Sequence, residues 1–451
     1  MARPIRRAVV FWAPRWLSCA MPRTPILLLA LGIGAALPAA AQTDSALLRR
    51  ALRLHREVPM FDLHNDHPWE RRRQRLLDDQ GGMRRGFPLW SEDASGRSTG
   101  YHTDIPRLRA GGVGAQFWSI WSPDSVAAIA PIRFPLEQID LTRRMEAAHP
   151  DVFAPARTAD DIVRAHRGGR IASLMGIEGG DAIANSLDLL RQFFDLGVRY
   201  MTLTWNRDLP WVDAASGTRS HNGLTPFGRE VVREMNRLGM LVDLSHVSDS
   251  VMAQAIRTSE APVIFSHSSA RALAEHRRNV PDAILRMLPR NGGVVGVNFY
   301  CDFVDSARIR WSRERVGLMQ QWRARFGTDT AAIRAASIAW ARSHPAPVTG
   351  IGVVADHIDH IRRVAGIDHI AYGSDYDGID CAPTGLEDVS TFPNLTAELL
   401  RRGYSDEDAK KILGNNMLRA MRQAEEVARR LQRERPPSLA TLAIDSAGMR
   451  N

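Results

Sequence analysis

Short apolar segments alternate with longer amphipathic segments along most of the chain. The apolar runs are five to eight residues long, which fits buried strands, and helical apolar spacing lies between several of them, as in Ser186–Leu196, Pro226–Leu238 and Ser248–Arg257. The strand-like runs are Met60–Asp66, Gly114–Trp121, Ile171–Glu178, Arg199–Trp205, Leu241–His246, Val263–His267, Val294–Phe299 and His369–Asp375. Eight such strands alternating with helices predict an α/β fold, a closed parallel TIM-like (β/α)8 barrel.

Two helical additions accompany the predicted barrel. Ser306–His344 has a helical pattern and is inserted before the last strand, and Ala397–Arg435 predicts a long helical C-terminal extension that Pro436 and Pro437 end. An open doubly wound sheet is the structural alternative, but no glycine-rich dinucleotide-binding motif follows the first run. We therefore expect one catalytic barrel domain over residues 42–435 and a loosely held tail over residues 436–451.

The charge of the chain argues against a nucleic-acid partner. The 451 residues include 59 Lys and Arg against 50 Asp and Glu, but residues 1–41 contribute five arginines and no acid. The weak excess that remains is poor support for nucleic-acid binding. The hydrophobic fraction of 44% and the charged fraction of 24% are typical of a globular protein.

The N-terminus has the pattern of a secretory signal peptide. Arg23 precedes an apolar run over Ile26–Leu37, and small residues at Ala39–Ala41 fit a cleavage site. Residues 1–20 precede this pattern, so either the segment ahead of the apolar run is unusually long or Met21 is the true start. A retained membrane anchor is the alternative, but the apolar run is short for a span, and no later segment is long enough. We expect export to the periplasm or the medium, with no membrane span after cleavage.

The mature chain would keep two cysteines, Cys301 and Cys381. An exported pair can form one disulfide, and both cysteines follow predicted strands. The sequence does not decide whether these two cysteines pair. It also does not decide whether the protein forms a homodimer.

Polar side chains gather at the C-terminal ends of the predicted strands, where barrel enzymes place their chemistry. His64 and Asp66 point the same way along a strand, and Glu178, His246 and His267 end three other runs. Histidine and carboxylate ligands suit zinc. Five ligands exceed the need of one catalytic zinc, so the pattern favours two zinc ions that share a carboxylate.

Longer motifs around these residues resemble the membrane (renal) dipeptidase family of zinc metallopeptidases, among the amidohydrolase-like barrels. The similar blocks extend from about Met60 to Arg422 and are specific enough to assign the family. They are Asp62–Asp66, Gly176–Gly180, Tyr200–Thr204, Gly223–His246, Ser266–Ala270, Arg277–Pro281, Val297–Tyr300 and Asp356–Gly378.

The resemblance implies a role for each site residue. His64 and Asp66 would bind one zinc, His246 and His267 the second, and Glu178 would bridge the two. Beyond the metal ligands, the resemblance assigns Arg278 to the substrate carboxylate, Asp375 to the substrate amine and the scissile bond, and Tyr300 to the substrate. His67, His357 and His360 are expected to lie outside the metal site.

One position departs from the family pattern. After Tyr200–Thr204 the family commonly has a histidine that contacts the substrate and the reacting oxygen, and this chain has Trp205. The indole N–H is only a donor, so Trp205 cannot replace an imidazole as an acid. The simpler interpretation of Trp205 is a wall residue of the substrate pocket, and nothing in the sequence shows that His221 substitutes.

The expected activity is zinc-dependent hydrolysis of dipeptides to free amino acids, with tolerance of a D residue at the C-terminal position as a family trait. Two alternatives stay open at this stage. A related amidohydrolase would act on N-acyl amino acids, and an exported metal-binding protein would be only weakly catalytic.

Overall fold

The computed structural model describes residues 39–72, 101–127 and 130–442. The chain divides into two compact units, Met1–Gln42 and Thr43–Asn451. The first unit is described only at residues 39–42, where helix α1 (Ala39–Glu57) begins, so the predicted signal peptide lies mostly outside the described residues. The fold below is that of the second unit.

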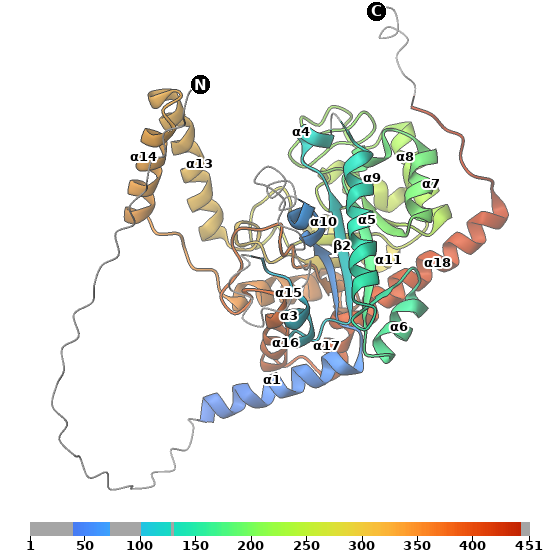
Figure 1. The fold of residues 1–451 in the computed structure, drawn as a ribbon, viewed down its shortest axis with the longest axis horizontal. Coiled ribbons are helices and arrows are strands. Elements are labelled where there is room, and N and C mark those ends of the chain that lie inside the picture. Colours follow the sequence, from blue (N-terminus) through green and yellow to red (C-terminus); the bar gives the residue numbers. More distant parts are fainter. Residues whose placement is uncertain (1–38, 73–100, 128–129, 443–451) are drawn as a thin grey trace, which may run out of the picture. The chain divides into compact units, whose positions relative to one another are not determined.

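Eight parallel strands close into a barrel that helices surround (Figure 1). The order around the barrel is β2-β1-β9-β8-β7-β6-β5-β4, and β4 pairs back with β2 from Ala115↔Ala172 to Trp121↔Glu178. The strands are β1 (Phe61–Asn65), β2 (Ala115–Trp121), β4 (Ile171–Glu178), β5 (Val198–Thr202), β6 (Leu241–Asp243), β7 (Ile264–Ser268), β8 (Val294–Val297) and β9 (Ile370–Tyr372). Six of the eight predicted runs contain their strand, and the runs for β5 and β7 miss one residue of it, so the (β/α)8 prediction is confirmed.

A ninth strand, β3 (Phe153–Pro155), was not predicted from the sequence. It pairs with the beginning of β4, from Phe153↔Ile171 to Pro155↔Ser173, while β5 pairs with the later residues of β4. Three residues are too few for a recognisable alternation of apolar and polar positions.

Helices follow the strands and have clear local signals at their ends. In α8 (Pro226–Leu238), Thr225 caps the N-terminus, Pro226 occupies the first turn, and Gly239 ends the helix at a φ of 84°. The other α-helices are α3 (Ile105–Ala110), α4 (Asp124–Ala127), α5 (Arg133–Ala148), α6 (Ala159–Arg167), α7 (Leu187–Asp195), α9 (Asp249–Thr258), α10 (Asp282–Leu285), α11 (Leu288–Asn291), α12 (Cys301–Val304), α13 (Ser306–Phe326), α14 (Thr330–Ser343), α15 (Ile351–Ala365), α16 (Phe392–Arg401), α17 (Asp406–Lys410) and α18 (Asn416–Glu434).

The two predicted helical additions are present, with breaks that the sequence analysis did not anticipate. The insertion before β9 is a helical hairpin, α13 and α14. The C-terminal extension is interrupted after α16, where Gly403 adopts a φ of 90° and Ser405 caps α17. A glycine at positive φ followed by a serine cap ends one helix and starts the next.

The first residues of the predicted tail make specific contacts. The backbone N–H of Ser438 donates to Glu234 Oε2 at 3.2 Å, and Arg191 donates to the carbonyl of Ser438 at 3.1 Å. Residues 443–451 lie outside the described residues.

Cys301 and Cys381 form a disulfide, with their Cα atoms 5.7 Å apart. The bridge ties the start of α12 to the loop that follows β9, next to the candidate active site. Across the residues that the structure describes, no helix combines the length and the apolar character needed to cross a bilayer.

Candidate active site

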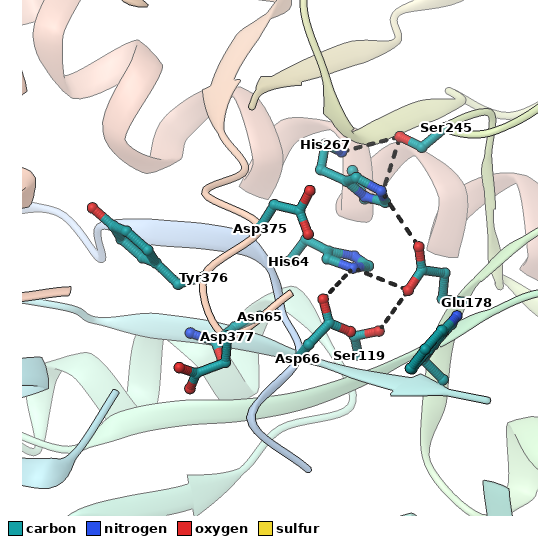
Figure 2. Close-up of polar contacts among 12 residues, drawn as sticks. His64, Asn65, Asp66, Ser119, Glu178, Ser245, His267, Asp375, Tyr376 and Asp377 are labelled. Carbon is teal, nitrogen blue, oxygen red and sulfur yellow. Dashed lines mark hydrogen bonds and ion pairs between the residues drawn. The ribbon is translucent and has the colours of Figure 1, made fainter. Parts of the chain in front are cut away.

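The barrel brings five predicted metal ligands together at the C-terminal ends of its strands, and four of them, His64, Asp66, Glu178 and His267, are labelled in Figure 2. His64 lies on β1, Glu178 ends β4, and His267 lies on β7. Asp66 follows β1 directly, and His246 lies three residues after the end of β6. These residues are far apart in the sequence, and parallel strands place them at one rim because all their carboxyl ends point the same way.

Glu178 occupies the centre of this cluster. Its Oε2 lies 3.4 Å from His64 Nε2, and its Oε1 lies 2.7 Å from His246 Nε2 and 3.5 Å from His267 Nε2. Asp66 Oδ2 lies 3.5 Å from His64 Nε2. Two groups of potential ligands therefore share the Glu178 carboxylate, one on each of its oxygens, and a third group joins His64, His267 and Asp375.

The atoms of this cluster fit divalent metal ions. His64 Nε2 and Asp66 Oδ1 are buried and have no hydrogen-bond partner among the described residues. His246 Nε2 and His267 Nε2 lie 3.0 Å apart. Burial, and then the charge of Arg278, lowers the pKa of His246 to about 3, so its imidazole is neutral. Imidazoles and carboxylates around one centre are the ligands that zinc takes in proteins.

Neighbouring side chains fix the tautomers of two histidines. The Ser266 hydroxyl donates to Asp243 Oδ2 at 2.6 Å, so His267 Nδ1 donates to Ser266 Oγ, 2.8 Å away. His246 Nδ1 donates to Asn206 Oδ1 at 3.3 Å. In both rings the lone pair is then on Nε2, which faces the cluster, as metal-binding histidines require.

His64 is oriented from across the barrel. Its Nδ1 lies 2.9 Å from the hydroxyl of Tyr200 on β5. Tyr200 reaches this position because Gly176 leaves room for its ring, since a Cβ on Gly176 would lie 2.0 Å from Tyr200 Cζ. Tyr200 and Gly176 lie in blocks that resemble the family, but neither was predicted to have a role in the site.

Asp375 faces the same cluster from the loop after β9. Burial raises its pKa to about 8, and Asn298 donates to its Oδ2 at 2.8 Å. Asp375 and His246 adopt left-handed backbone conformations, with φ of 66° and 68°. Non-glycine residues adopt this region at a cost, and such residues gather at functional sites.

The histidines that were expected outside the metal site have other partners. His67 Nδ1 lies 2.7 Å from Asp377 Oδ2. His357 Nε2 donates to the carbonyl of Val304 at 2.9 Å, and His360 Nε2 lies 2.7 Å from Asp282 Oδ1.

A cavity of about 440 Å³ opens beside the cluster. Arg278 lines it and is 3% exposed, and its Nη2 donates to His267 Nε2 at 2.7 Å. Its Nε and Nη1 have no hydrogen-bond partner among the described residues, and its guanidinium lies 5.2 Å from the centre of the Phe303 ring. Tyr300 and Asp375 also line the cavity.

Three tryptophans form one wall of the cavity. The ring of Trp205 lies 4.9 Å from that of Trp121, which lies 4.9 Å from that of Trp69. Trp205 also lies 6.1 Å from the His246 ring, so the departure from the family pattern borders the cluster. Trp69 and Trp121 were not predicted as site residues. Trp69 lies three residues after Asp66, and Trp121 ends β2, so proximity to the strand ends was the available signal.

A TIM-like barrel with this ligand cluster and cavity defines a metal-dependent hydrolase of the barrel type. The profile of the membrane dipeptidase family, peptidase family M19, matches residues 48–435, and the chain belongs to this family. It is a metallopeptidase that hydrolyses peptide bonds.

Known proteins agree with this assignment. Dipeptidase 3 from Mus musculus is 39% identical over 391 residues, which cover 85% of this chain and 68% of the mouse protein. A metallopeptidase from Rhodobacter sphaeroides, solved with a phosphinate mimic of the dipeptide L-Ala-D-Ala, is 25% identical with a TM-score of 0.64, over 81% of this chain and 99% of that chain. The probable dipeptidase PvdM from Pseudomonas aeruginosa shares the fold, with a TM-score of 0.70 at 22% identity over 85% of this chain and 100% of that chain.

Proposed function

We propose that this chain is a two-zinc dipeptidase that releases free amino acids and accepts a D residue at the C-terminal position. His64 and Asp66 would hold one ion, and His246 and His267 the other. Glu178 would bridge them, because each of its oxygens faces one group of ligands. When bound, the ions would supply Lewis acidity, which polarises a carbonyl and makes water a nucleophile near neutral pH.

The proposal of a dipeptide substrate rests on Arg278. It is a buried cation that forms no ion pair with a carboxylate of the described residues, and its Nη2 contacts only the His267 imidazole. Two of its donor atoms lie unpaired beside the cavity. A guanidinium binds a carboxylate through two parallel hydrogen bonds, so the free C-terminus of a short peptide is the ligand that fits.

Asp375 would serve the other end of the substrate. Its raised pKa allows it to hold a proton near neutral pH, and it faces the ligand cluster, where the scissile bond would lie. It would deliver that proton to the leaving amine and, when ionised, pair with the substrate ammonium. Contacts to both termini within one cavity of about 440 Å³ would favour dipeptides over longer chains.

Tyr300 and Trp205 would contact the substrate between these two ends, since both line the cavity. The relative solved with an L-Ala-D-Ala mimic supports the proposed tolerance of a D residue.

A panel of substrates tests the proposal. The zinc-loaded enzyme should hydrolyse L-Xaa-L-Ala and L-Xaa-D-Ala dipeptides and leave N-acetyl amino acids and tripeptides largely intact. Metal analysis after gel filtration should find about two zinc ions per chain. Glu178→Gln should lose more than one ion, because a neutral amide bridges two cations poorly. Turnover of acylated amino acids alone would instead establish a deacylase.

We further propose that residues 1–41 are an export signal, that residues 42–435 are the catalytic domain, and that the mature protein is periplasmic or secreted. The Cys301–Cys381 disulfide supports this, because disulfides persist in oxidising compartments. Sequencing the N-terminus of protein from its native host tests the cleavage, since Gln42 should be the first residue. An intact Met1 or Met21 would contradict it.

A further inference from the structure

The α13–α14 hairpin has little contact with the barrel. Among its described residues only Ile309 on α13 is buried, and no residue of α14 is. The two helices lie side by side (Figure 1), and the rings of Trp311 and Trp340 lie 5.3 Å apart across them. All but one of the described residues of the hairpin helices are therefore at least partly exposed to solvent.

This hairpin contains the excess positive charge of the mature chain. Residues 306–343 include eight arginines and two acids, Glu314 and Asp329. The rest of residues 42–451 has 46 basic and 48 acidic residues. A general preference for arginine would raise its number everywhere, but acids balance it only outside the hairpin.

Most of these arginines have no acidic partner. Arg308 pairs with Asp302, with Nε 2.9 Å from Oδ1. Asp329 is occupied at the N-terminus of α14, where it accepts from the backbone N–H of Ala332 at 2.9 Å. The other seven arginines are exposed and form no ion pair within the described part of the chain: Arg310, Arg313, Arg315, Arg323, Arg325, Arg334 and Arg342.

Apolar side chains are interspersed among the arginines. Val316 is 58% exposed and Ile338 is 44% exposed, and Trp322 and Phe326 are partly exposed. Tryptophan favours the interface between lipid and water, and arginine can lay its apolar stem on such a surface while its charge stays at the headgroups. This mixture fits a bilayer surface better than a nucleic acid, where exposed aliphatic side chains gain little.

We propose that the α13–α14 hairpin binds the surface of a bilayer that contains anionic phospholipids. The contact lies at the level of the headgroups, because charged residues on both helices prevent either from spanning. The binding depends on charge and is reversed by salt, which screens exposed arginines from lipid phosphates. This inference is independent of the substrate that the barrel hydrolyses.

Cosedimentation of the metal-loaded mature chain with lipid vesicles tests the proposal. The protein should pellet with vesicles that contain 30% phosphatidylglycerol in phosphatidylcholine, stay in solution with pure phosphatidylcholine, and be released at 1 M NaCl. A variant with Arg310, Arg315, Arg323 and Arg325 each changed to Gln should bind at least tenfold more weakly. Its hydrolysis of a soluble dipeptide should match that of the parent.

A matched control changes four exposed arginines elsewhere to Gln, namely Arg257, Arg290, Arg363 and Arg429. This control removes the same charge, and its vesicle binding should fall less than twofold. Equal losses in both variants would overturn the proposal, because net charge alone would then explain binding. So would an absence of binding to anionic vesicles, or retention on DNA without retention on vesicles.

Discussion

Gly378 packs directly against the carboxylate of Asp66. A Cβ at position 378 would lie 2.1 Å from Asp66 Oδ2 and 2.7 Å from Asp375 Oδ1. No side chain can occupy this position unless both carboxylates move, so a glycine after Asp377 is required for the geometry of the site.

Gly378→Ala should therefore weaken metal binding at the site of Asp66. We expect the affinity to fall about 10- to 100-fold, the range seen for changes next to metal ligands, with a matching loss of kcat/KM. Zinc content after dialysis against a weak chelator measures the effect. Gly317→Ala on α13 is the control, because a Cβ there meets nothing within 4 Å. Unchanged zinc content in Gly378→Ala would contradict the prediction, because the carboxylates would then move aside without loss of the metal.

Arg278→Ala should raise KM for dipeptides, because the substrate carboxylate would lose its charged partner in a buried place. Loss of such a pair costs on the order of 2–5 kcal/mol, which corresponds to roughly a 30-fold change or more in KM. Dipeptide amides should bind the parent enzyme poorly. They should bind the variant no more weakly than they bind the parent. If the variant still prefers the acid to the amide, another group binds the carboxylate.

Asp375→Asn should mainly lower kcat, because the amide cannot donate a proton to the leaving amine. General acid catalysis contributes on the order of 10²- to 10⁴-fold. Asn298→Ala should give a smaller loss, since it removes only the hydrogen bond that orients Asp375. Steady-state kinetics separates this effect from loss of metal, once each variant is confirmed to hold two zinc ions. A full kcat in Asp375→Asn would assign the proton to another group.

Trp205→His distinguishes two roles for the residue beside His246. If Trp205 replaced a contact to the reacting oxygen, histidine should increase kcat/KM for ordinary dipeptides. If Trp205 shapes the cavity for a particular side chain, the change should reduce activity on the substrate with that side chain. Profiling both enzymes on one dipeptide panel decides between them. Identical profiles would place Trp205 outside the reacting region.

His357 should make the protein less stable in acid. Its Nδ1 accepts the backbone N–H of Ala270 at 3.0 Å, and burial lowers its pKa to about 4. The unfolded chain takes up this proton near pH 6.5, so the free energy of unfolding should fall as the pH drops from 6.5 to 4. The contribution is on the order of 3 kcal/mol and is fully present only above pH 6.5.

Urea unfolding at several pH values measures this loss. In His357→Gln the free energy of unfolding should fall less steeply between pH 6.5 and 4, because this variant lacks the buried histidine. The remaining histidines titrate in both proteins and contribute equally. The same slope in both would mean that another buried group accounts for the acid sensitivity.

The sequence by itself determined the barrel and the place of the candidate metal ligands in it. Each strand of a parallel barrel is buried on both faces, so β4 and its neighbours appear as continuous apolar runs that can be read without a structure. His64, Glu178 and His267 end such runs, and the rule that strand ends form the rim then places them together.

The tertiary structure decided the contacts that depend on distance across the barrel. The Tyr200–His64 hydrogen bond, the room that Gly176 leaves for Tyr200, and the close packing of Gly378 on Asp66 join residues that no local pattern connects. The breaks in the C-terminal extension follow single residues, such as Gly403, whose backbone conformation an apolar pattern does not reveal. Only the structure shows that the α13–α14 hairpin is exposed. A helical pattern predicts the helices but not whether anything packs against them.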